Sequence, residues 1–345
     1  MSQTKSFSIN EKYRGIPAIN TSRMSRKEWQ AFRNSYKLLG GSELGTVIGL
    51  DEYKSPLALW REKIGLFKSE VKYNKYMAGG HVDEAGIITR LAHYDDNTGD
   101  WVANYANEKI VRCVEQVPYT LFPDYMPWVA LNIDGAITDD PFVKGFGVAE
   151  CKTIGTQTAK KYIGGLPPKY IAQLVAYMDG TGADFGRFAF LDTDRDFYSI
   201  LLTKDQENYK TFSSILHERC AEFFQAIQEG IDIMAGELTL AARTELFLLE
   251  QKYSSVLKVD NTLSTAKFLN DAQKEMQEKN ELKGNLFDAI IDAIIAARKG
   301  EEEYSSRKIN LENNIRVKMQ QLSCVSYVGS NYKISYNGRL TITVR

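Results

Sequence analysis

Apolar residues three to four positions apart predict helices in the first hundred residues of the chain. The first predicted helix covers residues 26–38, where large apolar side chains recur with the helical period. A second begins at Pro56, because Ser55 is a suitable N-cap and proline is favoured in a first helical turn, and it ends at Gly65. An amphipathic helix is predicted over residues 77–91.

The middle of the chain is predicted to form strands. Apolar runs bounded by turn-forming residues mark four of them, at residues 109–117, 128–134, 146–153 and 187–192. The Asp-Gly pair at 134–135 is typical of a turn, and a helix is expected after the Pro-Pro pair at 167–168. Helices first, then strands with a helix between them, predict an α/β or α+β core in which helices flank a central mixed sheet.

The last third of the chain has a different character. Helical periodicity dominates residues 205–229 and most of 262–322, and a β-hairpin with an Asn-Gly turn is predicted at 324–344. We therefore expect two domains. The first is a core over residues 1–204, and the second is a helical accessory region with a terminal β-hairpin over residues 205–345.

The composition is that of an ordinary soluble globular protein, with 43% hydrophobic and 25% charged residues in a chain of 345. At this length a chain can bury a core without disulfides or a structural metal. No apolar run approaches the roughly 20 residues that span a bilayer, and the opening residues MSQTKSFSINEKYRG lack the apolar segment of a signal peptide. We therefore expect a cytoplasmic protein without a membrane partner.

Cysteine and histidine offer little for a metal site. The four cysteines form no Cys-x-x-Cys pair, and the three histidines are scattered along the chain. This distribution excludes the zinc-ribbon motif and the closely spaced iron–sulfur motifs. Any metal chemistry would use carboxylates, which favour hard cations such as Mg²⁺ or Mn²⁺.

The formal net charge of −1 hides two basic stretches. Residues 1–40 hold eight Lys or Arg against two Glu, and residues 152–173 hold four Lys without any Asp or Glu. Either stretch alone is equally well explained as a solvated surface that carries lysines. Two such stretches in a neutral chain favour the binding of phosphate groups, as in a nucleic acid.

Three ionisable residues of the middle segment are predicted to converge. Glu150 and Lys152 are two apart on a predicted strand and so project from the same face. Asp134 lies at the predicted end of another strand, sixteen residues before Glu150, and the two strands would meet as a hairpin. Gln173 and Tyr177 are one helical turn apart and could face the same point from the next helix.

This arrangement suits phosphate chemistry. Two carboxylates, Asp134 and Glu150, can bring a divalent cation to a phosphodiester, and the main-chain carbonyl of Cys151 is a further hard oxygen ligand. Lys152 could position or activate water and offset negative charge in the transition state. Glu-x-Lys pairs are also common on exposed strands, where they have no special function. Here the pair follows the apolar residues 148–149 in a segment that reads as buried, and buried ionisable groups need partners.

Taken in order, these residues resemble the core of the PD-(D/E)XK nucleases. The pattern is an aspartate before a glycine, then Glu-x-Lys, then Gln-x-x-x-Tyr on a helix: Asp134-Gly135, Glu150-x-Lys152 and Gln173-x-x-x-Tyr177. Within that superfamily the chain is similar to the YqaJ-like viral recombinases, which include lambda exonuclease.

The N-terminal part carries the same resemblance. Trp29-x-x-x-Arg33 and the segment GGSELGTVIGLDEYKSPLALWREKIG at 40–65 resemble the opening motif of this family. Glu84 matches the family's acidic residue on a helix, and the likeness covers roughly residues 25–195. The resemblance implies the PD-(D/E)XK fold, in which helices flank a central mixed sheet.

The resemblance also implies roles at a metal site. Asp134 and Glu150 would be metal ligands, Glu84 a further acidic member, and Lys152 the catalytic lysine. The residues that would support the lysine and the substrate strand are Gln173 and Tyr177.

Further residues match DNA-contacting positions. Arg33, Ser42 and Glu43 correspond to positions near the terminal phosphate of the DNA, with Lys37 as a rival to Arg33. Lysines of the second basic stretch would contact the DNA backbone: Lys160 and Lys161.

The function expected from this resemblance is a Mg²⁺- or Mn²⁺-dependent deoxyribonuclease of the phage recombination type, in a bacterial host or encoded by a prophage. It would digest one strand of linear double-stranded DNA from an end and leave single strand for an annealing protein, and it could form a homo-oligomer. Two alternatives stay open. One is a structure-specific or non-specific endonuclease, and the other is a catalytically silent DNA-binding or assembly module.

Overall fold

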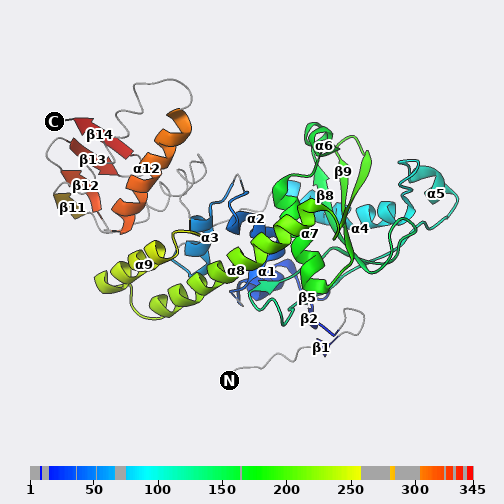
Figure 1. Cartoon of the computed structure of the whole chain (residues 1–345), viewed down its shortest axis with the longest axis horizontal. Coiled ribbons are helices and arrows are strands. Elements are labelled where there is room, and N and C mark those ends of the chain that lie inside the picture. The colour runs from blue at the N-terminus through cyan, green and yellow to red at the C-terminus, as the bar shows by residue number, and fades with distance from the viewer. Residues whose placement is uncertain are drawn as a thin grey trace. The chain divides into compact units, whose positions relative to one another are not determined.

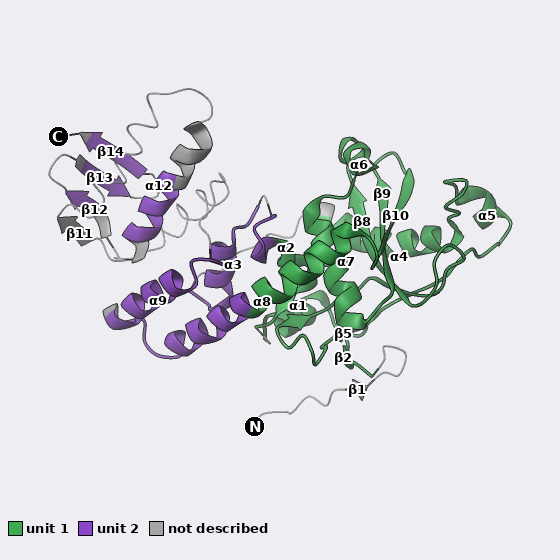
Figure 2. Ribbon diagram, in the orientation of Figure 1, with its two compact units in different colours: residues 1–45, 70–221 green, residues 46–69, 222–345 purple. Residues whose placement is uncertain are grey.

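The computed structural model describes most of the chain (Figure 1). The described residues are 8–9, 15–35, 37–51, 53–66, 75–163, 165–257, 280–283, 304–321, 324–328, 332–336 and 340–344. They divide into two compact units, one of residues 1–45 and 70–221 and the other of residues 46–69 and 222–345 (Figure 2). The domain boundary near residue 204 stays a prediction.

A five-stranded sheet forms the centre of the first unit. Its strand order is β10-β9-β8-β7-β4. The strands are β4 (Cys113–Gln116), β7 (Gly135–Asp139), β8 (Gly147–Ile154), β9 (Phe185–Asp192) and β10 (Phe197–Thr203). Only β8 and β9 of this sheet run parallel, and the other neighbours are antiparallel. The predicted central mixed sheet is therefore confirmed.

Helices cover both faces of this sheet. On one face, α4 (Lys75–His93) packs Ile87, Ile88 and Leu91 against Ala149 and Cys151 of β8. On the other face, α7 (Pro168–Thr181) packs Tyr170 against Phe188 of β9, with 4.9 Å between the ring centroids. All eight residues of β9 are buried, as expected of a strand covered on both faces.

The other elements up to residue 203 are short. The helices are α1 (Arg26–Ser35), η2 (Gly41–Glu43, a 3₁₀ turn), α2 (Leu44–Val47), α3 (Pro56–Lys63), α5 (Val102–Ala106) and α6 (Thr156–Ile163). The remaining strands are β1 (Ser8–Ile9), β2 (Pro17–Asn20), β3 (Leu39–Gly40), β5 (Tyr119–Leu121) and β6 (Val129–Ala130). They form a three-stranded sheet, β1-β2-β5, and a two-stranded sheet, β3-β6.

Several local signals give the predicted elements. Ser55 Oγ accepts a hydrogen bond of 3.2 Å from Ala58 N and caps α3, as predicted. The strand predicted at 128–134 is reduced to β6, and β10 was not predicted at all. The alternating aspartates before β10 hid it, because they form the turn from β9, in which Asp192 Oδ1 accepts hydrogen bonds from the main-chain N–H groups of Asp194 and Asp196.

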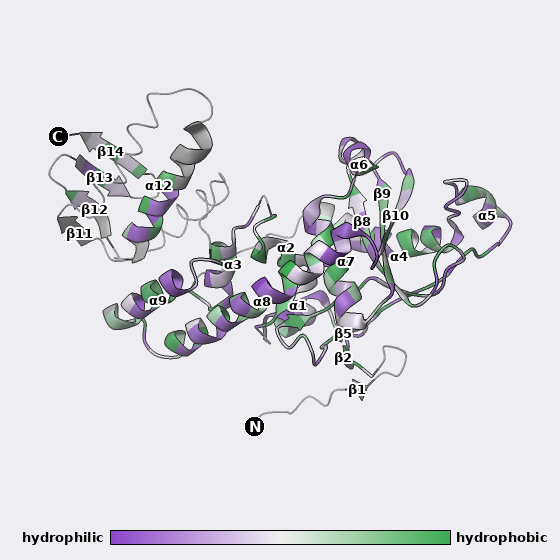
Figure 3. Ribbon diagram, viewed as in Figure 1, coloured by the Kyte–Doolittle hydropathy of each residue, from purple (hydrophilic) through white to green (hydrophobic). Residues whose placement is uncertain are grey.

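The rest of the described chain is mostly helical and ends in a small sheet. The elements are α8 (Glu207–Met234), α9 (Leu240–Lys252), β11 (Asn280–Lys283), α12 (Tyr304–Gln321), β12 (Cys324–Val328), β13 (Tyr332–Tyr336) and β14 (Leu340–Val344). Hydrophilic and hydrophobic residues alternate along α8 and α9 (Figure 3). The periodicity of 205–229 predicts α8, whereas α9 was not predicted. No described helix is long and apolar enough to cross a membrane.

The C-terminal strands exceed the predicted hairpin. β12, β13 and β14 are antiparallel, and β11 adds a parallel strand at the edge to give the order β11-β12-β13-β14. The prediction that most of 262–322 is helical is thus wrong at β11 and correct at α12, while residues 262–279 and 284–303 lie outside the described residues. Alternate residues of these strands, Tyr327, Ile334 and Tyr336, pack against α12.

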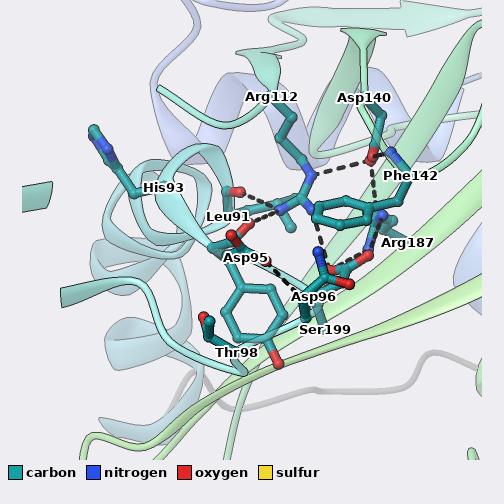
Figure 4. Close-up of polar contacts among 12 residues, drawn as sticks. Leu91, His93, Asp95, Asp96, Thr98, Arg112, Asp140, Phe142, Arg187 and Ser199 are labelled. Atoms are coloured by element: carbon teal, nitrogen blue, oxygen red, sulfur yellow. Dashed lines mark hydrogen bonds and ion pairs between the residues drawn. The ribbon is translucent and has the colours of Figure 1, made fainter. Parts of the chain in front are cut away.

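A buried ion-pair network ties the central sheet together (Figure 4). Arg112 Nε and Arg187 Nε both donate to Asp140 Oδ2, at 3.0 and 2.7 Å. Both guanidinium groups also reach Asp96, and Arg112 Nη1 donates to the carbonyls of Leu91 and Tyr94. The side chains of Arg112 and Asp140 are fully buried. This network satisfies two buried cations, as a dry interior requires.

Asp140→Asn is expected to lower the free energy of unfolding by about 3–5 kcal/mol at pH 7, because buried Arg112 and Arg187 lose one of the two carboxylates that they share. Burial alone would raise the pKa of Asp140, but the hydrogen bond from Arg187 and the two positive charges hold it below its usual value. The stability it contributes is therefore present above the unfolded pKa of about 3.9 and is lost as pH falls through the lower folded pKa.

Urea unfolding followed by circular dichroism at pH 7 and in steps below pH 5 measures this loss. The exposed neighbour Asp139, changed to Asn, is the matched control and should behave as the wild type. Equal stability of Asp140→Asn and Asp139→Asn would contradict the structural role of the network.

Candidate active site

The antiparallel pairing of β7 and β8 brings the predicted carboxylates together. Gly135, the first residue of β7, stands opposite Ala149. Asp134 immediately precedes β7 and so lies opposite Glu150 at the next position. The hydrogen bond of 2.7 Å from Cys151 N to Asp134 Oδ2 fixes the aspartate across the strand pair.

The prediction that Asp134 ends a strand was wrong. Asp134 precedes β7 instead of ending a strand, and Gly135 belongs to β7 instead of a turn. Gly135 is required by packing, because a Cβ there would lie 2.8 Å from Ile88 Cδ1 and 3.2 Å from the Cβ of Ala149. The Asp-Gly pair therefore reflects the close approach of α4 and β8, which a local sequence signal does not distinguish from a turn.

Glu150 and Lys152 form an ion pair on β8. Lys152 Nζ donates a hydrogen bond to Glu150 Oε1. The Glu150 side chain is 1% exposed, whereas that of Lys152 is 33% exposed. Glu150 Oε2 is buried and has no hydrogen-bond partner among the described residues. We refer to Asp134, Glu150 and Lys152 as the carboxylate–lysine site.

Glu84 of α4 lies close enough to this site to interact with it electrostatically. Burial and then the Glu150 carboxylate raise the pKa of Glu84. Burial raises the pKa of Asp134 well above its usual value, and the Glu150 and Glu84 carboxylates raise it further. Although enclosure alone would lower the pKa of Lys152, the carboxylates of Glu150 and Asp134 raise it on balance. Ionisation of all three carboxyl groups is therefore unfavourable beside a single ammonium.

Helix α7 places two polar residues beside the same carboxylates. Gln173 Nε2 donates to the Tyr177 hydroxyl at 2.8 Å, and that hydroxyl donates to the carbonyl of Asn132 at 2.9 Å. Burial and the charges of Glu150 and Asp134 raise the pKa of the Tyr177 hydroxyl well above its usual value. Tyr177 thus lies near the carboxylate–lysine site, and Gln173 is hydrogen-bonded to it.

The donor set fits a hard divalent cation. Mg²⁺ is commonly held by one or two carboxylates, with water and substrate phosphate completing its shell. Asp134 and Glu150 are such a pair, and Glu150 Oε2 is a buried oxygen that still needs a partner. Within the described ranges, no three or more His, Cys, Asp or Glu side chains are grouped closely enough to hold a metal ion by themselves.

Arg33, Ser42 and Glu43 also come together. Arg33 Nη2 lies 3.5 Å from Ser42 Oγ and 3.8 Å from Glu43 Oε1. Glu43 Oε2 accepts a hydrogen bond of 2.7 Å from Gly40 N, which holds the turn. Ser42 is exposed and the Arg33 side chain is 30% exposed, so both can reach a ligand. Lys37 lies in the connection after α1, is exposed, and has a left-handed φ of 49°.

A comparison with known families places these residues in one domain. Residues 28–184 match the family described as the YqaJ-like viral recombinase domain. We call residues 28–184 the YqaJ-like domain, after the family that they resemble. This segment contains every member of the carboxylate–lysine site, together with Arg33, Ser42, Glu84, Gln173 and Tyr177.

An individual relative shares only low sequence identity with this chain. The uncharacterized protein YqaJ of Bacillus subtilis (strain 168) is 25% identical over 171 residues, which cover 49% of this chain and 46% of that protein. The chain thus matches less than half the length of this relative.

Solved structures give a weaker likeness. An alkaline exonuclease (LHK-Exo) from Laribacter hongkongensis is 20% identical with a TM-score of 0.45, over 61% of this chain and 96% of that one. A phage-related exonuclease from Haemophilus somnus 129PT is 14% identical with a TM-score of 0.36, over 60% of this chain and all of that one.

Two predicted DNA contacts lie on a separate helix of the YqaJ-like domain. Lys160 and Lys161 are exposed on α6, which begins two residues after the end of β8. Their charges are available to a phosphate backbone. They do not belong to the carboxylate cluster.

Sequence reasoning missed two supporting residues. Asn132 contributes the carbonyl that accepts the Tyr177 hydroxyl, and Asp83 Oδ2 accepts a hydrogen bond of 3.3 Å from Thr153 Oγ1. Asn132 is two residues before Asp134, and Asp83 directly precedes Glu84, so proximity along the chain was the available signal. His81 lies near the cations Arg26 and Lys152, and burial followed by these two charges lowers its pKa.

Asp134→Asn is expected to raise the free energy of unfolding by about 0.5–2 kcal/mol at pH 7 with EDTA present, as is common when a functional site loses an unfavourable charge. The amide can still accept the hydrogen bond from Cys151 N. Because the folded pKa of Asp134 is raised, wild-type stability should increase as pH falls toward the unfolded value of about 3.9.

Urea titrations at several pH values measure this change. The exposed Asp124, changed to Asn, serves as the control. If Asp134→Asn has a lower free energy of unfolding than Asp124→Asn, the Asp134 carboxylate does not destabilise the fold.

Proposed function

We propose that the chain is a metal-dependent deoxyribonuclease that digests one strand of linear double-stranded DNA from an end. The observation that carries this proposal is the buried, unpartnered Oε2 of Glu150 beside Lys152 and Asp134, inside a YqaJ-like domain. An orphaned carboxylate oxygen is costly in a folded protein unless a cation or substrate completes it. The exposed product strand would pass to an annealing protein.

Asp134 and Glu150 would hold Mg²⁺ or Mn²⁺, with the Cys151 carbonyl and Glu84 as the further oxygen ligands. When bound, the ion supplies a Lewis acid that polarises the phosphate and lowers the pKa of bound water. The protein's own contribution is geometric. The β7–β8 pairing and the hydrogen bond from Cys151 N keep the two carboxylates opposite each other before any ligand arrives.

Lys152 would act as a fixed cation at the reacting phosphate. Its raised pKa keeps the ammonium protonated at neutral pH, so it donates hydrogen bonds and does not remove a proton. From a side chain that is one-third exposed, those donors can reach an attacking water or a phosphate oxygen. Positive charge aimed at the developing negative charge is a large term in phosphoryl-transfer catalysis.

Arg33 and Ser42 would bind the terminal phosphate of the DNA, and we call this pair the terminal-phosphate seat. A guanidinium and a hydroxyl 3.5 Å apart can both donate to one phosphate group. Glu43 attracts the Arg33 guanidinium towards Ser42. The distance from Arg33 Nη2 to Glu43 Oε1 is 3.8 Å, so guanidinium N–H groups remain available to a phosphate. Lys160 and Lys161 would add sequence-independent contacts to the DNA backbone.

Lys152→Ala is expected to lower the turnover of linear duplex DNA by about 100–1,000-fold with Mg²⁺ present, as when one transition-state donor is removed. End-labelled linear duplexes and covalently closed circles, incubated with Mg²⁺ or with EDTA, measure both activity and dependence on an end. Lys144→Ala, at an exposed lysine in the β7–β8 connection, is the matched control.

An active Lys152→Ala variant would refute the role of the lysine. Cleavage of closed circles at the rate of linear duplexes would show that the protein is an endonuclease and not an exonuclease. If no DNA is cleaved with Mg²⁺ or Mn²⁺, the nuclease proposal is wrong and a DNA-binding module is the alternative.

Mg²⁺ is expected to stabilise the wild type by about 2.7 kcal/mol at a concentration 100 times the dissociation constant. The same titration of Glu150→Gln should give no such gain, because the variant lacks one of the two carboxylates. Thermal unfolding with increasing Mg²⁺ measures the shift in each protein without reference to activity. An equal Mg²⁺-induced increase in the unfolding temperature of both proteins would mean that Glu150 does not bind the metal.

A further inference from the structure

Gly41 lies in contact with the ring of Tyr177. A Cβ on Gly41 would lie 3.1 Å from both Cδ1 and Cζ of Tyr177 and closer still to Cε1. Gly41 is buried and begins η2, the turn that also carries Ser42. Because carbon atoms in contact are normally about 3.5–4.0 Å apart, any side chain here would push the turn and helix α7 apart by about 1 Å.

The Tyr177 side of this contact is fixed to the carboxylate–lysine site. The Tyr177 side chain is buried, and its hydroxyl accepts from Gln173 and donates to the Asn132 carbonyl. Asn132 is two residues before Asp134 on the same segment. The ring therefore cannot move away from Gly41 without breaking hydrogen bonds that hold it next to Asp134.

The Gly41 side of the contact is fixed to the terminal-phosphate seat. Gly40 N donates to Glu43 Oε2 at 2.7 Å across the turn. Arg33 lies 3.5 Å from Ser42 and 3.8 Å from Glu43, so the guanidinium follows the same turn. A shift of Gly41 would carry both donors of the seat with it.

We propose that the contact between Gly41 and the Tyr177 ring is a spacer that fixes the distance from the terminal-phosphate seat to the carboxylate–lysine site. It thereby determines which phosphodiester, counted from the strand end, is cut. This inference rests on the proposed function of the two sites. Gly41 and the Tyr177 ring act here as positioning residues, through van der Waals contact.

A small change in the spacer has a large effect on register. Successive nucleotides of a B-DNA strand rise about 3.4 Å, so a displacement of about 1 Å is a substantial part of one step. A misplacement of that size at the reacting atoms can cost about 100-fold in rate. DNA ends without a phosphate do not use the seat, and their cleavage is insensitive to its position.

Gly41→Ala tests the spacer directly. Labelled linear duplexes with either a phosphate or a hydroxyl at the strand end give kcat, KM and the length of the first product. The wild type should cut phosphate ends faster and release a first product of one length. Gly41→Ala should lose about 100-fold in kcat on phosphate ends, with little change in KM and with hydroxyl ends cut at the wild-type rate.

Binding without catalysis separates positioning from loss of the seat. In EDTA, fluorescence anisotropy with a phosphate-ended duplex should give Gly41→Ala the wild-type affinity, whereas Arg33→Gln weakens binding. Gly79→Ala is the matched control, because a Cβ at Gly79 meets nothing within 4 Å, and it should match the wild type in every measurement.

The outcomes are distinct. An equal loss on both kinds of end, no loss on either, or a wild type that does not distinguish the ends would overturn the spacer while leaving a nuclease. Absence of cleavage by the wild type would remove the proposed function and the spacer with it. If Gly41→Ala fails to fold, Tyr177→Leu removes the spacer from the other side and should give first products of mixed length. A single product length in that variant would overturn the inference.

Discussion

Enclosure of like charges at the junction of β7 and β8 is the constraint on which the YqaJ-like domain depends. Asp134 and Glu150 stand opposite each other across an antiparallel strand pair, and Glu84 approaches from α4. One ammonium, that of Lys152, offsets only part of this charge. An isolated fold would gain by replacing these residues with apolar ones. The rigid sheet and its two covering helices make the unfavourable arrangement possible, which is typical of a site shaped for a ligand.

The sequence predicts the local part of this site well. Alternation along β8 puts Glu150 and Lys152 on one face, and the four-residue spacing of Gln173 and Tyr177 puts them on one side of α7. Both rules depend only on the geometry of a single element. Ser55 as the cap of α3 is predicted for the same reason, because a cap acts within four residues.

Contacts between elements are predicted less well. Gly135 reads as a turn residue, but its role is decided by Ile88 and Ala149, which belong to other elements. Arg112 and Arg187 carry no local sign that both will share Asp140, since the register of three separate strands sets that meeting. Gly41 is similar: a glycine in a turn looks ordinary until Tyr177, far along the chain, is found against it.

The arginine–aspartate network also bears on the order in which the core assembles. Its members are remote along the chain, since the hydrogen bond from Arg187 to Asp96 spans 91 positions and the one to Asp140 spans 47. Loop closure on this scale is slow and brings no reward until the partners meet. Before β9 pairs with β8, Arg187 is absent from the network. Burial of Arg112 and Asp140 is then unfavourable, because they lack this partner. We therefore expect the interior on this side of the sheet to close late in folding, after β9 has joined β8.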